Sequence, residues 1–392
     1  MENKMKEKYN VKIEPLTPIH IGTGEELTPL DYLVSQKVGE SKFKNPMYFK
    51  FSSDKILARL VEQKNQQQLA LFENLSTSAN MKDFQNFFNK NFTLDDLDYP
   101  CEITNGFLQK YKSNIGKDPL QNASVVNQLY RPEGLKTPVI PGSAIKGSIR
   151  TAVLNSILYN IPDVHYNELK TAFSQERNKK DFNTKIQKKL LNNYSDAKND
   201  PFRAVQIGDA TFSAKGSQIV GELFNVSFNE QKECLEKIKM QILAETIKGS
   251  LLGGKVTSCF NILLDNPLMK TDQIKKEISI KEIQIACNEF YKTQFSNEYK
   301  KFYQNCYENT DKIVELEKVI DEVCESKDSF VIRLGRWSQV EFVTMGSDFR
   351  MPKTSINKKT GKSKAWGTTR TLFDYNGQYL PMGWCKCTIE NL

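Results

Sequence analysis

The sequence predicts an α+β fold, in which mainly antiparallel strands carry helices on one face. The opening segment YNVKIEPLTPIHIG and the closing segment GQYLPMGWCKCTIE both show strand-like alternation of apolar and polar residues. Helix-like blocks lie between these ends, without the regular strand-helix alternation of a parallel sheet. With 392 residues, 39% of them hydrophobic, the chain can bury a sizeable core and form two or three domains.

The first half of the chain begins with a half-buried strand that is interrupted between Pro15 and Pro18 and followed by a glycine turn at 22–24. Residues 52–117 are rich in Gln and Asn and predict a helical insertion, with Phe84, Phe87 and Phe88 at helical spacing. The next segment, TPVIPGSAIKGSIRTAVLNSILYN, predicts a strand, a tight turn and a helix. Residues 171–200 are polar and basic and predict a solvated helix and a loop.

The second half is predicted to contain strands on both sides of a helical block. Four short strand candidates are RAVQIGDATF, QIVGELFNVSF, MQILAETI and TSCFNILLD. Residues 271–327 form a long helical block whose charged positions should face water. The chain then continues with FVIRLG, a basic segment and the final strand pattern.

Composition argues against secretion, membrane insertion and metal binding. The N-terminus is charged, and no run approaches the roughly 18 apolar residues that cross a bilayer, so we expect a cytoplasmic protein without membrane partners. The eight cysteines are scattered without CxxC spacing. Cys385 and Cys387 should share one side of a strand, where a core position is favoured over a metal site because neither His20 nor His165 lies nearby in sequence. We therefore expect no metal and no cofactor.

The positive charge is concentrated late in the chain. The formal net charge is +8, and the segment from Phe349 to Thr371 contains no carboxylate. Its cations are Arg350, Lys353, Lys358, Lys359, Lys362, Lys364 and Arg370. Such a segment repels itself unless a polyanion lies beside it, which favours a nucleic-acid partner.

The segment PGSAIKGSIR at 141–150 is a candidate phosphate site. Gly142 permits close backbone approach, Ser143 can cap the helix, and the amides of the first turn lack partners within the helix. Lys146 and Arg150 lie four residues apart on one side of the helix, and Gly147 leaves room for a neighbour. Plain helix capping is the alternative, and the GxxxxGK[ST] spacing of a nucleotide-triphosphate loop is absent.

Two further groups of residues suit RNA. His20 precedes the turn Gly22-Thr23-Gly24, where an imidazole can stack on a base, contact a phosphate, act as an acid or base, or simply end a strand. The closing stretches IRLGRW, WGTTRTL and PMGW interleave glycine, arginine and tryptophan, which suits phosphates and stacked bases. The alternative for the tryptophans, Trp384 in particular, is a place in the core.

Taken together, these residues resemble the RAMP superfamily of CRISPR proteins, and within it the fifth Csm subunit of type III-A effector complexes. The matching stretches are LTPIHIGTGEEL, VIPGSAIKGSIRTAVL, FRAVQIGDATF, AETIKGS, IRLGRW, WGTTRTL and PMGW, in the family's order. The resemblance implies two modified RRM or ferredoxin-like units with helical insertions. These would be an N-terminal domain at 1–200 with its insertion at 52–117, and a C-terminal domain at 201–392 with its insertion at 271–327.

The resemblance also implies a function. Such a subunit caps the backbone of the complex at the 3′ end of the guide RNA and assists guide maturation without catalysing it. Its partners would be the guide RNA, the backbone and small Csm subunits, and host nucleases that trim the guide. The residues expected to contact RNA are His20, Gly22, Thr23, Gly24, Gly142, Ser143, Lys146, Gly147, Arg150, Gly335, Arg336, Lys353, Lys364 and Arg370.

Two other functions are compatible with the sequence. One is an endoribonuclease that uses His20 as a general acid or base, or Asp31 and Asp209 as ligands of a divalent metal. We favour a structural role for Asp31, because it precedes an apolar run at a strand start. The other is a protein-bridging subunit whose basic segment contacts an acidic partner.

Overall fold

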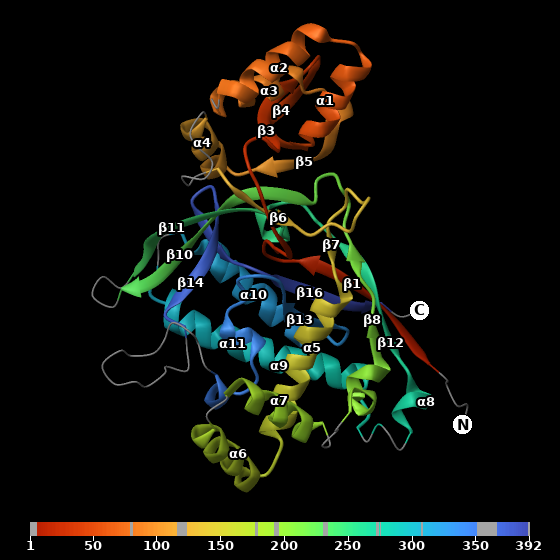
Figure 1. The fold of residues 1–392 in the computed structure, drawn as a ribbon. Coiled ribbons are helices and arrows are strands. Elements are labelled where there is room, and N and C mark those ends of the chain that lie inside the picture. The colour runs from red at the N-terminus through yellow and green to blue at the C-terminus, as the bar shows by residue number, and fades with distance from the viewer. Residues whose placement is uncertain are drawn as a thin grey trace.

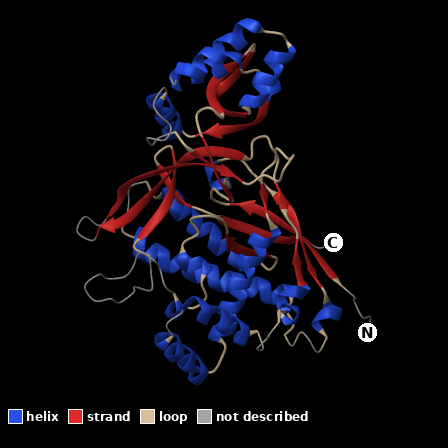
Figure 2. Cartoon of the chain, in the orientation of Figure 1, coloured by secondary structure: helices blue, strands red, loops and turns tan. Residues whose placement is uncertain are grey.

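Two curled sheets and the helices packed against them form the molecule, which confirms the predicted α+β class (Figure 1). The computed structural model describes residues 6–78, 81–115, 124–176, 179–191, 196–229, 234–271, 274, 276–306, 309–350 and 367–390. Figure 2 shows the strands gathered in the middle of the molecule, with helices on both outer sides. No helix in these ranges is long and apolar enough to span a membrane.

The strands are β1 (Glu7–Pro15), β2 (Gly22–Leu27), β3 (Tyr32–Val38), β4 (Ser41–Phe51), β5 (Leu97–Ile103), β6 (Val126–Leu129), β7 (Val139–Ile140), β8 (Val205–Ile207), β9 (Ala210–Thr211), β10 (Gln218–Asn229), β11 (Cys234–Ile247), β12 (Ser258–Leu264), β13 (Ser329–Arg333), β14 (Thr369–Tyr375), β15 (Gln378–Pro381) and β16 (Trp384–Glu390). The helices are α1 (Ser53–Glu62), α2 (Gln66–Ser78), α3 (Met81–Asn91), α4 (Asn105–Asn114), α5 (Gly142–Tyr159), α6 (Asp163–Gln175), α7 (Lys179–Leu190), α8 (Asn266–Met269), α9 (Ile280–Glu298), α10 (Asp311–Glu325) and α11 (Val340–Val343). A π-helical turn, η6 (Tyr299–Tyr303), continues α9.

The five-stranded sheet joins the two ends of the chain. Its order is β13-β16-β1-β12-β8, and all neighbours are antiparallel. In its central strand β1, Val11 and Ile13 alternate with polar residues and are fully buried, as the sequence pattern predicts. Cys385 and Cys387 of β16 are also fully buried, so the predicted packing role agrees with their position.

The second sheet has the order β2-β6-β11-β10-β5-β4-β3, with β14 and β15 attached through β10. Its longest component is the antiparallel hairpin of β10 and β11. At one end, β3, β4 and α1–α3 enclose a separate small core that contains Phe49, Phe51, Phe87 and Phe88 (Figure 1). The helical content expected at 52–117 is therefore present, together with strand β5.

The main core lies between the two sheets and the helices α5, α9 and α10. The apolar stripe predicted for α5 is present, since Ile145, Ile149 and Ala152 are fully buried. Strands from both sides of residue 200 share each sheet, because β1 lies between β12 and β16, and β5 pairs with β10. The domain division at residue 200 stays a prediction.

A buried ion cluster connects α9, β13 and β14. The Glu298 carboxylate lies 3.0 Å from the Arg333 guanidinium and 2.5 Å from that of Arg370. Arg370 also lies 3.3 Å from the carboxylate of Glu341. All four side chains are inaccessible to solvent, so these charges balance one another inside the core.

The same cluster holds the chain on both sides of residues 351–366. Before that segment, Arg350 donates to Gln294 Oε1 (2.8 Å) and to the Glu341 carbonyl (3.3 Å). After it, the Gly367 amide donates to Glu341 Oε1 (2.6 Å). Arg350 and Gly367, the described residues on either side of the basic segment, therefore both bind Glu341.

We expect Arg370→Ala to lower the free energy of unfolding by about 3–5 kcal/mol, because removing one partner leaves uncompensated carboxylates in the core. Urea unfolding followed by circular dichroism measures the change. Arg336→Ala removes an exposed guanidinium and should cost less than about 0.5 kcal/mol. Equal effects of the two substitutions would contradict the role of the cluster.

Candidate nucleic-acid interface

Segments that are far apart in sequence meet around His20. The Arg336 amide donates to the His20 carbonyl (2.9 Å), and the Gly383 amide donates to the Pro18 carbonyl (2.9 Å). Gly335 has a φ of +82°, and a Cβ at this position would lie 2.5 Å from the His20 carbonyl oxygen. The sequence motifs HIGTG, IRLGRW and PMGW therefore build one junction, in which Gly335 is required by a close backbone crossing.

The His20 ring lies inside this junction. It is 1% exposed, its Nδ1 donates to the Glu245 carbonyl (2.8 Å), and its centroid lies 4.9 Å from that of the Trp337 indole. Burial lowers the pKa of His20, and nearby Arg336 lowers it further, against the opposing effects of the Glu245 carbonyl and carboxylate. The ring is therefore neutral at pH 7 and supports Trp337.

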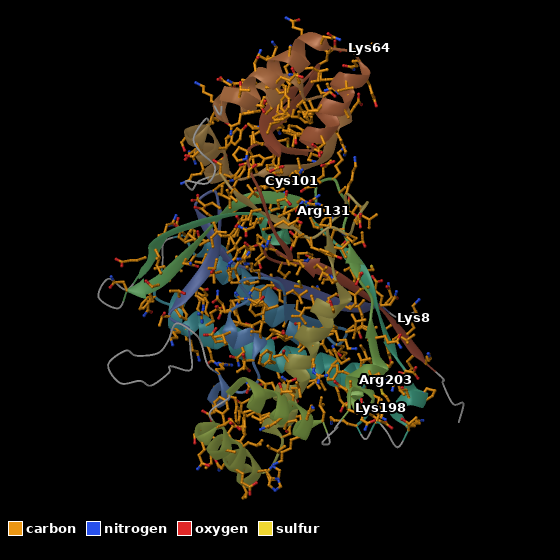
Figure 3. The ribbon with its side chains drawn as sticks, viewed as in Figure 1. Lys8, Lys64, Cys101, Arg131, Lys198 and Arg203 are labelled. Carbon is orange, nitrogen blue, oxygen red and sulfur yellow. The ribbon has the colours of Figure 1, made fainter. Side chains whose placement is uncertain are left out.

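An ion pair that the sequence did not indicate lies beneath His20. The Glu245 carboxylate is fully buried and accepts from Arg131 (2.8 Å), the Tyr99 hydroxyl (2.8 Å) and the Leu129 amide (3.0 Å). Figure 3 shows Arg131 near Cys101, where the β3–β5 region joins the rest of the molecule. The available signal was Glu245, which directly follows the apolar run Ile242-Leu243-Ala244 of β11, because a buried carboxylate needs partners.

The outer face of the junction carries groups that suit RNA. Arg336 is exposed, donates to Asn127 Oδ1 (2.9 Å), and its guanidinium carbon lies 5.0 Å from the centre of the Trp337 ring. Trp337 is partly exposed. Gly22, Thr23 and Gly24, for which the sequence predicted a turn, instead form the exposed and irregular start of β2 beside His20. A guanidinium next to aromatic rings can pair with a phosphate while a base stacks. The carboxylates of Glu25 and Glu26 follow in the same strand and limit the positive charge.

The start of α5 differs from the predicted phosphate site. The Gly142 amide donates to Asp209 Oδ1 (2.6 Å), so a carboxylate of the chain itself occupies the position expected for a phosphate. A Cβ at Gly142 would lie 2.1 Å from the Ile207 carbonyl oxygen, which shows that this glycine permits helix-strand packing. Ser143 is exposed and does not serve as the N-cap, since the cap position is Pro141.

The two cations of α5 share a carboxylate. Arg150 forms an ion pair with Asp200 (2.8 Å), and both side chains are about one-fifth exposed. Lys146 is half-buried, and burial lowers its pKa, while Asp200 opposes this effect and Arg150 adds to it. Gly147 is exposed, and nothing lies within 4 Å of a Cβ placed there. Lys146 and Gly147 remain accessible, whereas much of the charge of Arg150 is neutralised.

The remaining predicted contacts have different positions. Arg370 is 1% exposed within the ion cluster, so the expectation that it faces RNA does not agree with its location. Lys353 and Lys364 lie outside the described residues. The cluster encloses Arg370 because the neighbouring carboxylates of Glu298 and Glu341 require a counter-charge.

The residues considered for catalysis have structural roles here. Asp31 accepts from both the amide and the hydroxyl of Thr28 (2.8 Å each), and Asp209 accepts from Gly142. Across the described ranges, no group of three or more His, Cys, Asp or Glu side chains is arranged to hold a metal ion.

Comparison with known proteins gives the family and the fold. The RAMP superfamily model matches residues 12–388. The chain is similar to one in a cryo-EM structure of a Csm-crRNA-target RNA ternary complex of a type III-A CRISPR-Cas system, with a TM-score of 0.62, 20% identity, and coverage of 97% of this chain and 100% of that one. It is also similar to Csm5 of T. onnurineus in a crystal structure, with a TM-score of 0.55, 17% identity, and coverage of 95% and 99%. No curated protein matches by sequence. The likeness over nearly the whole length confirms the predicted RAMP-type core.

The low pKa of His20 predicts a specific acid sensitivity. Below about pH 6.5 the unfolded state binds a proton that the folded ring does not, so stability falls as pH drops through this value towards the lowered folded pKa. Within that window the loss is at most about 1.4 kcal/mol per pH unit. His20→Gln should flatten the decline between pH 7 and pH 5 in urea unfolding. His165→Gln, which changes an exposed histidine, serves as the control, and an equal effect of both substitutions would contradict the prediction.

Proposed function

The chain belongs to the RAMP superfamily, and from this premise we propose that it is a non-catalytic RNA-binding subunit of a type III-A CRISPR effector complex. In this proposal it caps the backbone of the complex at the 3′ end of the guide RNA and assists guide maturation in the cytoplasm. Its partners are the guide RNA, the backbone and small Csm subunits, and trimming nucleases. The division into units at 1–200 and 201–392 belongs to the same proposal.

The observation that carries the proposal is the exposed Arg336, which lies over Trp337 on the His20 junction. A guide RNA has variable sequence, so a subunit that holds it must contact phosphates, sugars and base faces. Arg336 and Trp337 offer a guanidinium and an aromatic face, and the exposed Gly22 and Gly24 have no side chain that would keep RNA away from the backbone.

A second contact is proposed on α5. Lys146 and Gly147 are accessible, which suits a phosphate contact. The Ser148 hydroxyl lies 3.3 Å from the Arg333 carbonyl, so its side of α5 faces the strand before Arg336, whereas Lys146 lies two residues away and projects from the opposite side of the helix. In the proposal, the glycine segment 22–24 and the Arg336 loop form one RNA contact, and Lys146 and Gly147 form a separate one.

We expect affinity for single-stranded RNA to depend steeply on salt and little on sequence. If about five phosphates are contacted, the logarithm of the affinity should fall with the logarithm of the salt concentration at a slope of about −3.5. Fluorescence anisotropy with labelled RNAs of two unrelated sequences, measured from low to high KCl, gives the slope. A response independent of salt would contradict the proposal.

A cleavage assay with the same labelled RNA tests whether the protein is catalytic. The labelled RNA is incubated with the protein, with and without magnesium or manganese, and the products are separated on a gel. The proposal expects intact RNA. Cleavage that is lost in His20→Ala or Asp31→Ala would replace it with an endoribonuclease function.

We expect Arg336→Glu to weaken RNA binding by at least tenfold, because the change removes a cation from an aromatic stacking site and adds a repulsive charge. The matched control is Lys64→Glu, at the tip of the α1–α3 region and far from the junction (Figure 3). The control should change affinity less than twofold in the same anisotropy assay. Equal losses would show that only the net charge matters.

A further inference from the structure

A polar groove of about 560 Å³ lies between the second half of α5 and α9. Its α9 wall includes Thr293 and Asn297, which lie four residues apart and therefore project from one side of the helix, and Lys301 lines the groove from the π-helical turn that follows. Arg350 closes one part of the groove, directly before the basic segment 351–366. The volume falls within the range of about 300–1,000 Å³ that is typical of small-molecule sites.

The charge around the groove favours an anion. Arg350 adjoins the buried ion cluster of Arg333, Arg370, Glu298 and Glu341, because it donates to the Glu341 carbonyl (3.3 Å) and to Gln294 Oε1 (2.8 Å). Arg350 therefore lies between the cluster and the groove. Burial lowers the pKa of Arg350, which shows that its charge lacks the hydration of a surface guanidinium.

The balance of charges lining the groove is also positive. Lys301 is exposed at the rim, on the π-helical turn that continues α9. Among the described lining residues, Glu289 is the one carboxylate, against the two cations Lys301 and Arg350. A phosphate carries the opposite charge to these two cations and can accept hydrogen bonds from both.

The other lining groups suit a nucleobase. The amide residues Asn155, Asn160, Gln294 and Asn297 line the groove. A carboxamide carries both donors and acceptors, and here Gln294 Oε1 accepts from Arg350 (2.8 Å) while Asn160 Nδ2 donates to the Ser156 carbonyl (2.8 Å). Asn155 is oriented by a hydrogen bond from the Gly346 amide to its Oδ1 (3.0 Å). Tyr159 is 54% exposed and stacks on Tyr166 at 5.9 Å, which leaves a large part of its aromatic side chain open to solvent. Amides that pair with base edges and an aromatic ring that stacks are the usual means of holding an unpaired base.

We propose that this groove binds one nucleoside phosphate, either free or as a unit of an RNA chain. Its phosphate lies between Arg350 and Lys301, and its base contacts the carboxamides and Tyr159. The free form does not depend on the RNA-binding function proposed above, whereas the chain-bound form rests on it.

The test compares Lys301→Glu with Lys300→Glu in the full-length protein. Lys300 is the exposed neighbour of Lys301 and does not line the groove, so both changes alter the net charge equally. The probes are AMP, inorganic phosphate and a five-nucleotide RNA, with affinities measured by isothermal titration calorimetry. We expect Lys301→Glu to weaken binding of AMP, of the RNA, or of both, at least tenfold, and Lys300→Glu to change it less than twofold.

The probes separate the two sources of the ligand. An effect on AMP indicates that a free nucleotide is sufficient, and an effect on the five-nucleotide RNA alone indicates a unit of a chain. A third variant, Asn297→Leu, should weaken AMP or RNA while leaving inorganic phosphate unchanged, because it removes a base contact.

Two results would overturn the proposal. One is equal behaviour of the Lys301 and Lys300 variants with both AMP and the short RNA. The other is binding of inorganic phosphate as tightly as AMP and the short RNA, without any effect of Asn297→Leu, which would identify a simple anion site. In either case, binding of long RNA that still depends on Arg336 would leave the proposed function intact.

Discussion

The Glu298 carboxylate and the two guanidinium groups that it holds organise the C-terminal half of the molecule. Arg333 ends β13, Arg370 lies in β14, and Glu298 ends α9, so one buried charge fixes the relative positions of three elements. Loss of either arginine would leave buried negative charge without a partner and would strongly destabilise the fold. The three elements are therefore held in this one arrangement. The position of β13 in turn sets the position of the Gly335-Arg336-Trp337 loop that follows it.

Carboxylates within the molecule need cations as partners, and this need determines which cations remain available for RNA. An arginine of these motifs can pair either with a carboxylate of the chain or with an external phosphate. Arg370 satisfies Glu298 and Glu341, and Arg150 is largely satisfied by Asp200, whereas Arg336 is exposed with an uncharged amide, that of Asn127, as its hydrogen-bond acceptor. The proposed RNA surface therefore contains fewer exposed cations than the motifs contain basic residues.

Packing within the molecule also explains why the motifs contain glycine. Gly335 is needed where the chain crosses the His20 carbonyl, and Gly142 is needed where α5 begins against the Ile207 carbonyl. In both places a methyl group would overlap backbone atoms, so these glycines allow segments that are far apart in sequence to pack together. The motifs thereby create the surface on which Arg336 and Trp337 are displayed, even where the glycines themselves do not face it.

The sequence by itself determined the fold class, most strand and helix positions, the core role of Cys385 and Cys387, and the family, because periodicity and glycine placement are local signals. It did not determine that Asp209 caps α5, that Arg370 is buried, or that α5 and α9 form a groove. The hydrogen bond from Gly142 to Asp209 and the ion pair of Arg370 with Glu298 join residues more than 60 positions apart, and the groove arises where α5 packs against α9. Charge patterns in a sequence do not specify such pairings, so only the tertiary structure decided which basic residues remain exposed.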